Sequence, residues 1–85
     1  KTSIKRCYPN PFNSALDLEL NLGEVSNLLT VYDITGKEVQ TLLPRKLSQG
    51  KHLIKWNAKN LTSGPYFIMI QSGNTKKVRR VTYLK

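Results

Sequence analysis

The chain has 85 residues and carries 14 Lys and Arg against five Asp and Glu, which gives a formal net charge of +9. This length suits one small domain, and the single Cys excludes an intramolecular disulfide. The sequence contains no run of about 18 apolar residues, the length a membrane-spanning helix requires, so it predicts no transmembrane segment.

The charge is distributed unevenly along the chain. All five acidic residues lie within the first 38 residues, where four bases bring the sum to −1, and the remainder carries ten bases and no acid. Such a basic half could attract phosphates, acidic lipids or anionic polysaccharide, or it could be a basic surface without a specific partner. We expect no specific nucleic-acid partner, because most of the few aromatic residues sit at core-like positions and leave no stacking platform.

The first half of the chain predicts strands through its period of two. Residues 15–22 alternate four Leu with Asp, Glu and Asn, the pattern of a half-buried strand. Residues 28–32 form a second run that is rich in β-branched and aromatic residues, and residues 37–43 form a third. The segment 33–37 between them is predicted to be a hairpin loop in which Gly36 supplies a positive φ.

The second half continues the same pattern. After a turn at residues 48–50, the run 51–57 alternates and places Trp56 on its apolar face. Residues 66–71 are apolar on both faces, which predicts a central strand. Residues 76–84 then form the last strand, after a Ser-Gly-Asn turn.

These runs predict an all-β fold, an immunoglobulin-like antiparallel β-sandwich of six strands, or seven if residues 4–8 also pair. The Cys…Trp…Cys pattern of antibody domains is absent, so the likeness concerns architecture only. Trp56 is expected in the core. We expect a single domain over residues 1–85 and, since the chain begins with Lys rather than Met, a fragment of a longer protein.

The residues that could carry chemistry are few and scattered. His52, the only His, lies in line with Ile54 and Trp56 on an apolar strand face, which favours a packed side chain over a catalytic one. Lys5 and Arg6 could lower the pKa of Cys7, but a small half-buried Cys is the favoured interpretation. One Cys and one His cannot form a zinc set, and the glycines stand one per turn rather than in a phosphate-binding loop. The sequence therefore predicts no catalytic, metal or cofactor site, and no enzyme.

One segment is more specific than the rest. Directly before the first amphipathic strand stand Tyr8, Pro9, Asn10, Pro11, Phe12 and Asn13. This opening resembles that of the type A C-terminal sorting domain of the bacterial type IX secretion system, the Por secretion tail, and that of the related immunoglobulin-like domain of the flagellar hook-capping protein.

The resemblance continues in order along the chain. Residues 31–39 are similar to the family's hairpin, and residues 50–57 to its Gly-x-His…Trp strand. Residues 61–67 are similar to its Leu-x-Ser-Gly-Val-Tyr-Phe element, and residues 78–85 to its closing strand, which ends in Lys. The motif residues are expected to be mainly structural: Tyr8, Pro9, Asn10, Pro11, Gly36, Trp56, Gly64 and Tyr66.

Prolines at three positions carry structural expectations. Pro9 and Pro11 have no N–H, so their segment is expected to lie along a sheet edge without extending it. Pro65 stands where the family usually has Val, and it suggests that this end of the strand is unpaired. Cys7 is a second departure, since a polar residue is common at that position.

The resemblance implies a function without catalysis. The resemblance implies that the chain is the C-terminal fragment of a longer secreted protein. Such a domain directs a larger cargo protein through the bacterial outer membrane by being recognised by the translocon. It would be periplasmic in transit and then at the cell surface or secreted, and a sortase-like protease often removes it as the cargo is attached to surface lipopolysaccharide. The implied partners are the translocon, the surface-attachment machinery and the upstream cargo, with an anionic surface glycolipid or polysaccharide as a further candidate.

The candidate recognition residues lie at the end of the chain: Lys76, Lys77, Arg79, Arg80 and Lys85. They could form part of the surface that the translocon recognises, or protect a sheet edge against aggregation. At alternating spacing Lys77 and Arg79 share one face and Arg80 the other, so one arginine must lie at an edge, extend past apolar surface, or sit beside a bulge.

Two other functions stay open at this point. One is a structural or accessory immunoglobulin-like module of a multidomain surface protein or glycoside hydrolase, a class that includes the hook-capping domain. The other is a nucleic-acid binder, which the basic half of the chain alone supports.

Overall fold

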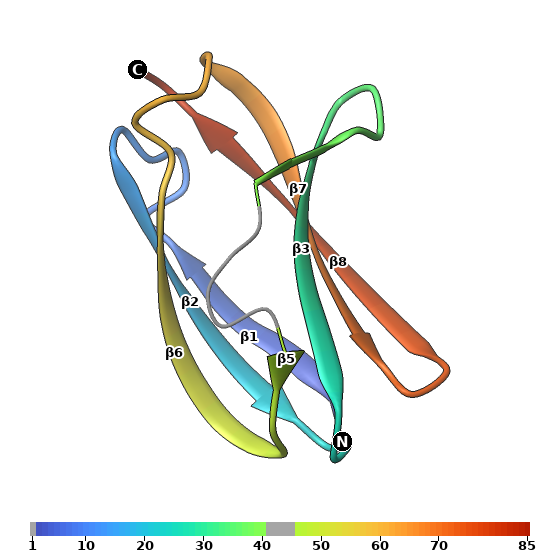
Figure 1. Cartoon of the computed structure of the whole chain (residues 1–85). Helices are drawn as coiled ribbons and strands as arrows, with labels where there is room; N and C mark the ends of the chain where they lie inside the picture. The colour runs from blue at the N-terminus through green and yellow to red at the C-terminus, as the bar shows by residue number, and fades with distance from the viewer. Residues whose placement is uncertain (1, 41–45) are drawn as a thin grey trace.

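The computed structural model of the chain describes residues 2–40 and 46–85, which form strands and turns without a helix (Figure 1). The eight strands are β1 (Ser3–Tyr8), β2 (Ala15–Leu22), β3 (Asn27–Asp33), β4 (Glu38–Gln40), β5 (Lys46–Leu47), β6 (Gly50–Asn57), β7 (Gly64–Ser72) and β8 (Thr75–Tyr83). The all-β prediction is confirmed, and residues 4–8 do pair. The strand that the sequence did not indicate is β5, because two residues are too short to show a period.

The strands build two antiparallel sheets that face each other (Figure 1). One has the order β1-β2-β6, and the other has the order β4-β3-β7-β8. The short β5 pairs with the first residues of β3, and β4 pairs with residues near its end. In immunoglobulin terms this is A-B-E against G-F-C-C′. The predicted immunoglobulin-like sandwich is therefore confirmed.

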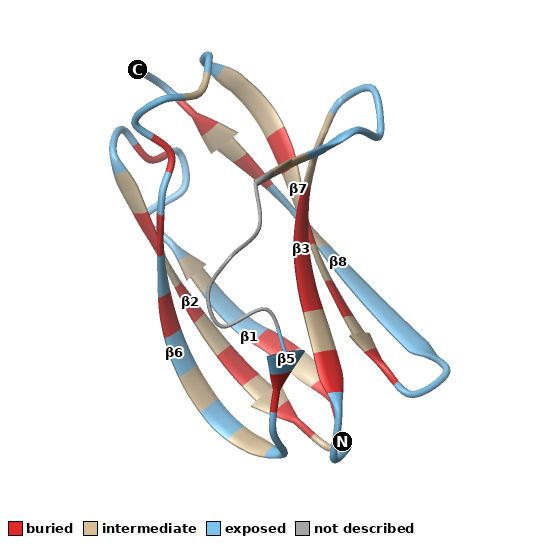
Figure 2. Ribbon diagram, in the orientation of Figure 1, coloured by how far each residue is buried: buried red, intermediate tan, exposed pale blue. Residues whose placement is uncertain are grey.

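The core lies between the two sheets and follows the predicted alternation (Figure 2). On β2 the four Leu side chains are buried, while Asp17 and Glu19 between them are only half-buried. Trp56 of β6 has no exposed surface, as expected for a core residue. Burying each such large apolar side chain contributes roughly 1.5–3 kcal/mol, which a small domain without a disulfide requires.

The central position predicted for residues 66–71 is confirmed, since β7 lies between β3 and β8. The prediction that the chain is unpaired at Pro65 is wrong for the β8 side, where Pro65 faces Thr82. The Thr82 amide points away from β7, so Pro65 belongs to a non-hydrogen-bonded pair and its nitrogen faces β3. The register with β3 ends at Tyr66, and the missing N–H of Pro65 therefore interrupts neither ladder.

The predicted hairpin between β3 and β4 is confirmed. Gly36 has a φ of 86°, a value that favours glycine. The Gly36 amide donates to the carbonyl of Asp33 at 3.0 Å, and the Asp33 amide donates to the carbonyl of Lys37 at 2.9 Å. The strand predicted over residues 37–43 is observed as Glu38–Gln40, and its remainder lies outside the described residues.

Candidate recognition surface

Four of the five predicted recognition residues lie on β8, an edge strand of the larger sheet, and Lys85 follows it. β8 is exposed over its first four residues, beside the turn that joins it to β7 (Figure 2). Across the strand pair, Lys76 faces Gln71, and Arg80 faces Phe67. The positive charge of β8 is thus set against apolar side chains and an amide.

Basic residues elsewhere have a different setting. On β6, Lys55 faces Asp17 of β2, and its Nζ atom lies 3.6 Å from the carboxylate. Lys51 faces Asn21 of the same strand. The basic half of the sequence is therefore divided between the sheets, and it is the β8 bases that lie away from the acidic residues of β2.

Alternation divides the β8 bases between two faces. Lys77 and Arg79 share the inward side with the buried Val81, while Lys76 and Arg80 point outward with Val78. Arg79 is half-buried, and its Nη2 atom donates a hydrogen bond of 2.7 Å to the backbone carbonyl of Ile4 in β1. Arg79 is thus the arginine that extends across an edge, and it links the edge strand β8 of one sheet to the edge strand β1 of the other.

The β1 strand has an irregularity at the same place. The pairing with β2 shifts between Ile4 and Arg6, which leaves Lys5 without a partner in the register. Lys5 and Arg6 are both exposed as a result. The carbonyl that Arg79 contacts is therefore at the start of a bulge.

The Tyr8–Asn13 segment holds the C-terminal end of β8. The Thr82 amide donates to Oδ1 of Asn10 at 2.9 Å, and the Phe12 amide donates to the Thr82 carbonyl at 3.0 Å. The Leu84 amide in turn donates to the Phe12 carbonyl at 2.8 Å. The expectation for Pro9 and Pro11 is met in part: the segment follows the β8 edge, and Phe12 extends the sheet there by one parallel bridge to Tyr83.

Phe12 is a structural residue that the candidates chosen from the sequence did not include. It is 2% exposed and its ring lies 5.1 Å from the Tyr83 ring and 5.4 Å from the Trp56 ring. The signal for it was its place inside the motif, where it is the one apolar residue that follows the second Pro. Tyr8, by contrast, is exposed, and the Arg6 guanidinium lies 4.7 Å from the centre of its ring.

Tyr66 and Gly64 organise a corner at the same end of the sandwich, where Gly64 faces Tyr83 across the strand pair. The Tyr66 hydroxyl donates to the backbone carbonyl of Thr62 at 2.6 Å, and its ring meets Trp56 edge-on at 5.7 Å. This is the tyrosine corner of immunoglobulin-like folds, at the start of the strand equivalent to F. Gly64 has a φ of 149°, which lets the chain enter β7 directly after the corner.

The Asp33 side chain closes the β3–β4 hairpin. Its carboxylate accepts hydrogen bonds from the Thr35 hydroxyl at 2.5 Å, the Thr35 amide at 2.9 Å and the Lys37 amide at 3.1 Å. The pKa of Asp33 is held below its ordinary value of 3.8, mainly by the Thr35 hydroxyl and further by the two amides and the charge of Lys37. Gly36 and Asp33 thus both shape the turn of this hairpin.

The two residues considered for catalysis are in packed settings. His52 is half-buried, and its Nε2 atom donates to the Ser48 carbonyl at 2.8 Å. Cys7 is half-buried beside the core, and burial raises the pKa of its thiol above the ordinary value of 9.0, with a smaller opposing effect of the Arg79 charge. Lys5 and Arg6 could have lowered the pKa of Cys7, but the pKa is raised instead.

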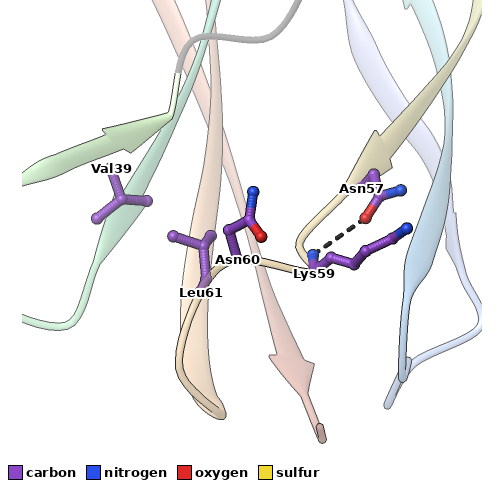
Figure 3. Close-up of a pocket in the computed structure, with 5 residues that line it drawn as sticks. All are labelled: Val39, Asn57, Lys59, Asn60 and Leu61. Carbon is purple, nitrogen blue, oxygen red and sulfur yellow. Dashed lines mark hydrogen bonds between the residues drawn. The ribbon is translucent and has the colours of Figure 1, made fainter.

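The hollows on the surface are lined by both polar and apolar side chains. One, of about 500 Å³, is lined by Val39, Asn57, Lys59, Asn60 and Leu61 (Figure 3). Within it the Lys59 amide donates to Oδ1 of Asn57 at 3.0 Å, so part of its polar surface is engaged locally. No group of three potential metal ligands occurs within residues 2–40 and 46–85, and none of these residues forms a helix able to cross a membrane.

Comparison with known proteins gives one result. A family model described as the secretion system C-terminal sorting domain matches residues 6–83, nearly the whole chain. Searches of curated proteins and of solved structures return no match. The matched span begins before Tyr8 and runs through the last residue of β8, so it includes both segments that meet at the end of the sandwich.

Proposed function

The chain belongs to the family of secretion system C-terminal sorting domains, which are signals for type IX secretion of cargo proteins, and from this premise we propose that the exposed bases of β8 and Lys85 are part of what the translocon recognises. The domain works with the type IX system and a cargo domain in the same chain, and its destination is the cell surface or the outside. Within the proposal, residues 1–85 are one domain at the C-terminal end of the cargo. The domain is recognised in the periplasm and afterwards removed by a sortase-like protease.

The observation that supports this proposal is the setting of the β8 bases. Lys76, Lys77 and Arg80 are exposed on one edge strand, and Lys85 follows within a few residues. Their cross-strand neighbours on β7 are apolar or amide side chains, so the charge is available to a partner. A domain that acts through such a surface needs a stable fold and no catalytic group of its own.

The test is an export assay with charge-neutral variants. A reporter fused to residues 1–85 should reach the surface of a bacterium that has a type IX system. Changing Lys76, Lys77, Arg80 and Lys85 to Gln should reduce surface reporter about tenfold or more and leave it in the periplasm. Arg79 is kept in this variant because its bond to Ile4 makes it part of the fold.

A matched control removes the same charge elsewhere. Lys5, Lys37, Lys51 and Lys59 are also exposed, and changing these four to Gln lowers the net charge equally. Export of this control should stay within about twofold of the parent. If both variants keep the parent's thermal melting and both are exported normally, the β8 bases protect an edge and are not a recognition element.

A further inference from the structure

The outer face of the larger sheet is apolar where an exposed sheet face is normally polar. Cross-strand pairs place Tyr32 beside Phe67, and Thr30 beside Met69, which in turn lies beside Val78. We call this surface the outer patch: Leu28, Thr30, Tyr32, Phe67, Met69 and Val78. Val78 is 56% exposed, whereas Thr30 at the centre is only 3% exposed.

The outer face of the smaller sheet provides a contrast within the same molecule. Its cross-strand neighbours are Arg6 with Glu19, Asp17 with Lys55, and Asn21 with Lys51, and its exposed large apolar or aromatic side chains are Leu53 on β6 and Tyr8 on β1. That is the polar outer face expected of an antiparallel sheet in water. The larger sheet departs from this pattern over three strands, which is typical of a surface that another molecule covers.

Charged residues border the outer patch, most of them basic. Lys46 of β5 faces Leu28. On β8, Lys76 faces Gln71, and Arg80 faces Phe67. Glu38 of β4 faces Tyr32 and is the acidic exception at one corner. Tyr, Phe, Met and Arg are the residue types enriched at the centres of protein interfaces, whereas Lys is common at their rims.

We propose that the outer patch is the surface through which the domain docks on a protein component of the export machinery, one whose apolar contact area is bordered by carboxylates. This inference rests on the proposed function and narrows it: the outward bases Lys76 and Arg80 act together with the patch, while the inward Lys77 and Arg79 do not take part. A sheet face whose aromatic rings are half-buried suits a complementary protein surface.

The charges and the shape distinguish this occupant from two others. A second copy of the chain would bring two mostly basic borders, each with Lys46, Lys76 and Arg80, to the same contact, which is electrostatically less favourable than a border of carboxylates. A membrane would require apolar side chains that project into it, whereas Tyr32, Phe67 and Met69 lie half-buried within the sheet surface. An acidic protein surface satisfies both the charge and the shape.

The experiment compares two double variants on edge strands of opposite sheets. Val78→Gln with Arg80→Glu alters the outer patch, and Leu53→Gln with Lys51→Glu makes the same kind of change at the same spacing on β6. Val78 and Leu53 are 56% and 70% exposed, and Arg80 and Lys51 are also exposed, so both variants should melt like the parent. We expect the first to reduce surface reporter at least about tenfold, and the second to stay within about twofold.

Site-specific photo-cross-linking in exporting cells gives a second measurement. A benzoylphenylalanine at position 78 should form an adduct with an export component, the Arg80→Glu change should abolish that adduct, and the same label at position 53 should form none.

The outcomes separate the two proposals. If the parent fusion is not exported, the proposed function fails. If the parent is exported and the Val78/Arg80 variant is exported equally well, the docking surface alone is wrong. Binding of the purified chain to vesicles containing phosphatidylglycerol, or a dimer in sedimentation, would also overturn it if the Val78/Arg80 variant abolished that behaviour, because the occupant would then be a membrane or a second copy.

Discussion

The amide of Thr82 donates a 2.9 Å hydrogen bond to the side chain of Asn10, which lies 72 positions earlier in the chain. Two backbone hydrogen bonds between Phe12 and the end of β8 lie beside it. The motif that most resembles the family's opening is thus the part of the molecule that covers the β8 edge near its C-terminal end. The rest of that edge, beginning at Thr75, is exposed for four residues.

The first prediction concerns this contact. Asn10→Ala should lower the free energy of unfolding by about 1 kcal/mol, because the Thr82 amide loses its acceptor. Asn10→Asp keeps an oxygen at the same position and should cost less. Urea denaturation followed by Trp56 fluorescence measures both. In the Ala variant, amide hydrogen exchange should accelerate more at Thr82 than at the residues of β2. If Ala and Asp have the same effect, the oxygen of Asn10 is not what holds the strand.

The fold could be predicted from the sequence to the extent that it depends on local alternation. Residues 15–22 show the period of two over a full strand, and the structure confirms the strand and its buried face. The hairpin at Gly36 was predictable for the same reason, since its turn chemistry is local. β5 was not, because two residues carry no period and their pairing with β3 is a tertiary contact.

The candidate surface shows the same limit. Alternation indicated that Arg79 and Arg80 must face opposite ways, but it could not say which of them contacts another strand. The answer depends on the Ile4 carbonyl, 75 positions away, at a bulge without a sequence signature. The outer patch required the register between β3, β7 and β8, because its side chains come together only across strands.

A second prediction tests the tyrosine corner. Tyr66→Phe keeps the ring against Trp56 and removes the 2.6 Å hydrogen bond to the Thr62 carbonyl. We expect the free energy of unfolding to fall by about 1 kcal/mol. Tyr32→Phe is the matched control, since Tyr32 is half-buried on the outer face and its loss of a hydroxyl should change stability by less than about 0.5 kcal/mol. Equal melting of the Tyr66 variant and the parent would contradict a structural role for the hydroxyl.

A third prediction concerns pH and the β3–β4 hairpin. Since folding holds the pKa of Asp33 below 3.8, its carboxylate favours the folded state at every pH above that value. The contribution should be lost as the pH falls below 3.8 and through the lower pKa of the folded state. An NMR titration of the Asp33 carboxyl should show a midpoint below 3.8.

The control for this titration uses variants of Thr35, whose hydroxyl contributes most to the lowered pKa of Asp33. Thr35→Ala removes the hydroxyl donor and should raise the Asp33 midpoint toward its ordinary value, and Thr35→Ser should restore much of the lowering. The stability difference between the parent and an Asp33→Asn variant should also shrink as the pH falls through this range. A midpoint that Thr35→Ala leaves unchanged would assign the lowered pKa to the backbone amides instead.

The last prediction separates structure from recognition within β8. Arg79→Gln should lower the free energy of unfolding by about 1–2 kcal/mol, because the charged hydrogen bond to the Ile4 carbonyl links the edges of the two sheets. Lys77→Gln, two positions earlier on the same face and exposed, should change stability by less than about 0.5 kcal/mol. Thermal melting of the two variants measures this difference.

Cys7 offers a second measurement at the same place. The charge of Arg79 lowers the pKa of the Cys7 thiol against the larger effect of burial, so Arg79→Gln should raise that pKa further. The pH profile of Cys7 alkylation by iodoacetamide should then move to higher pH. A shift to lower pH would mean that the variant exposes the thiol, and an unchanged profile with unchanged melting would mean that Arg79 is free to serve recognition instead of the fold.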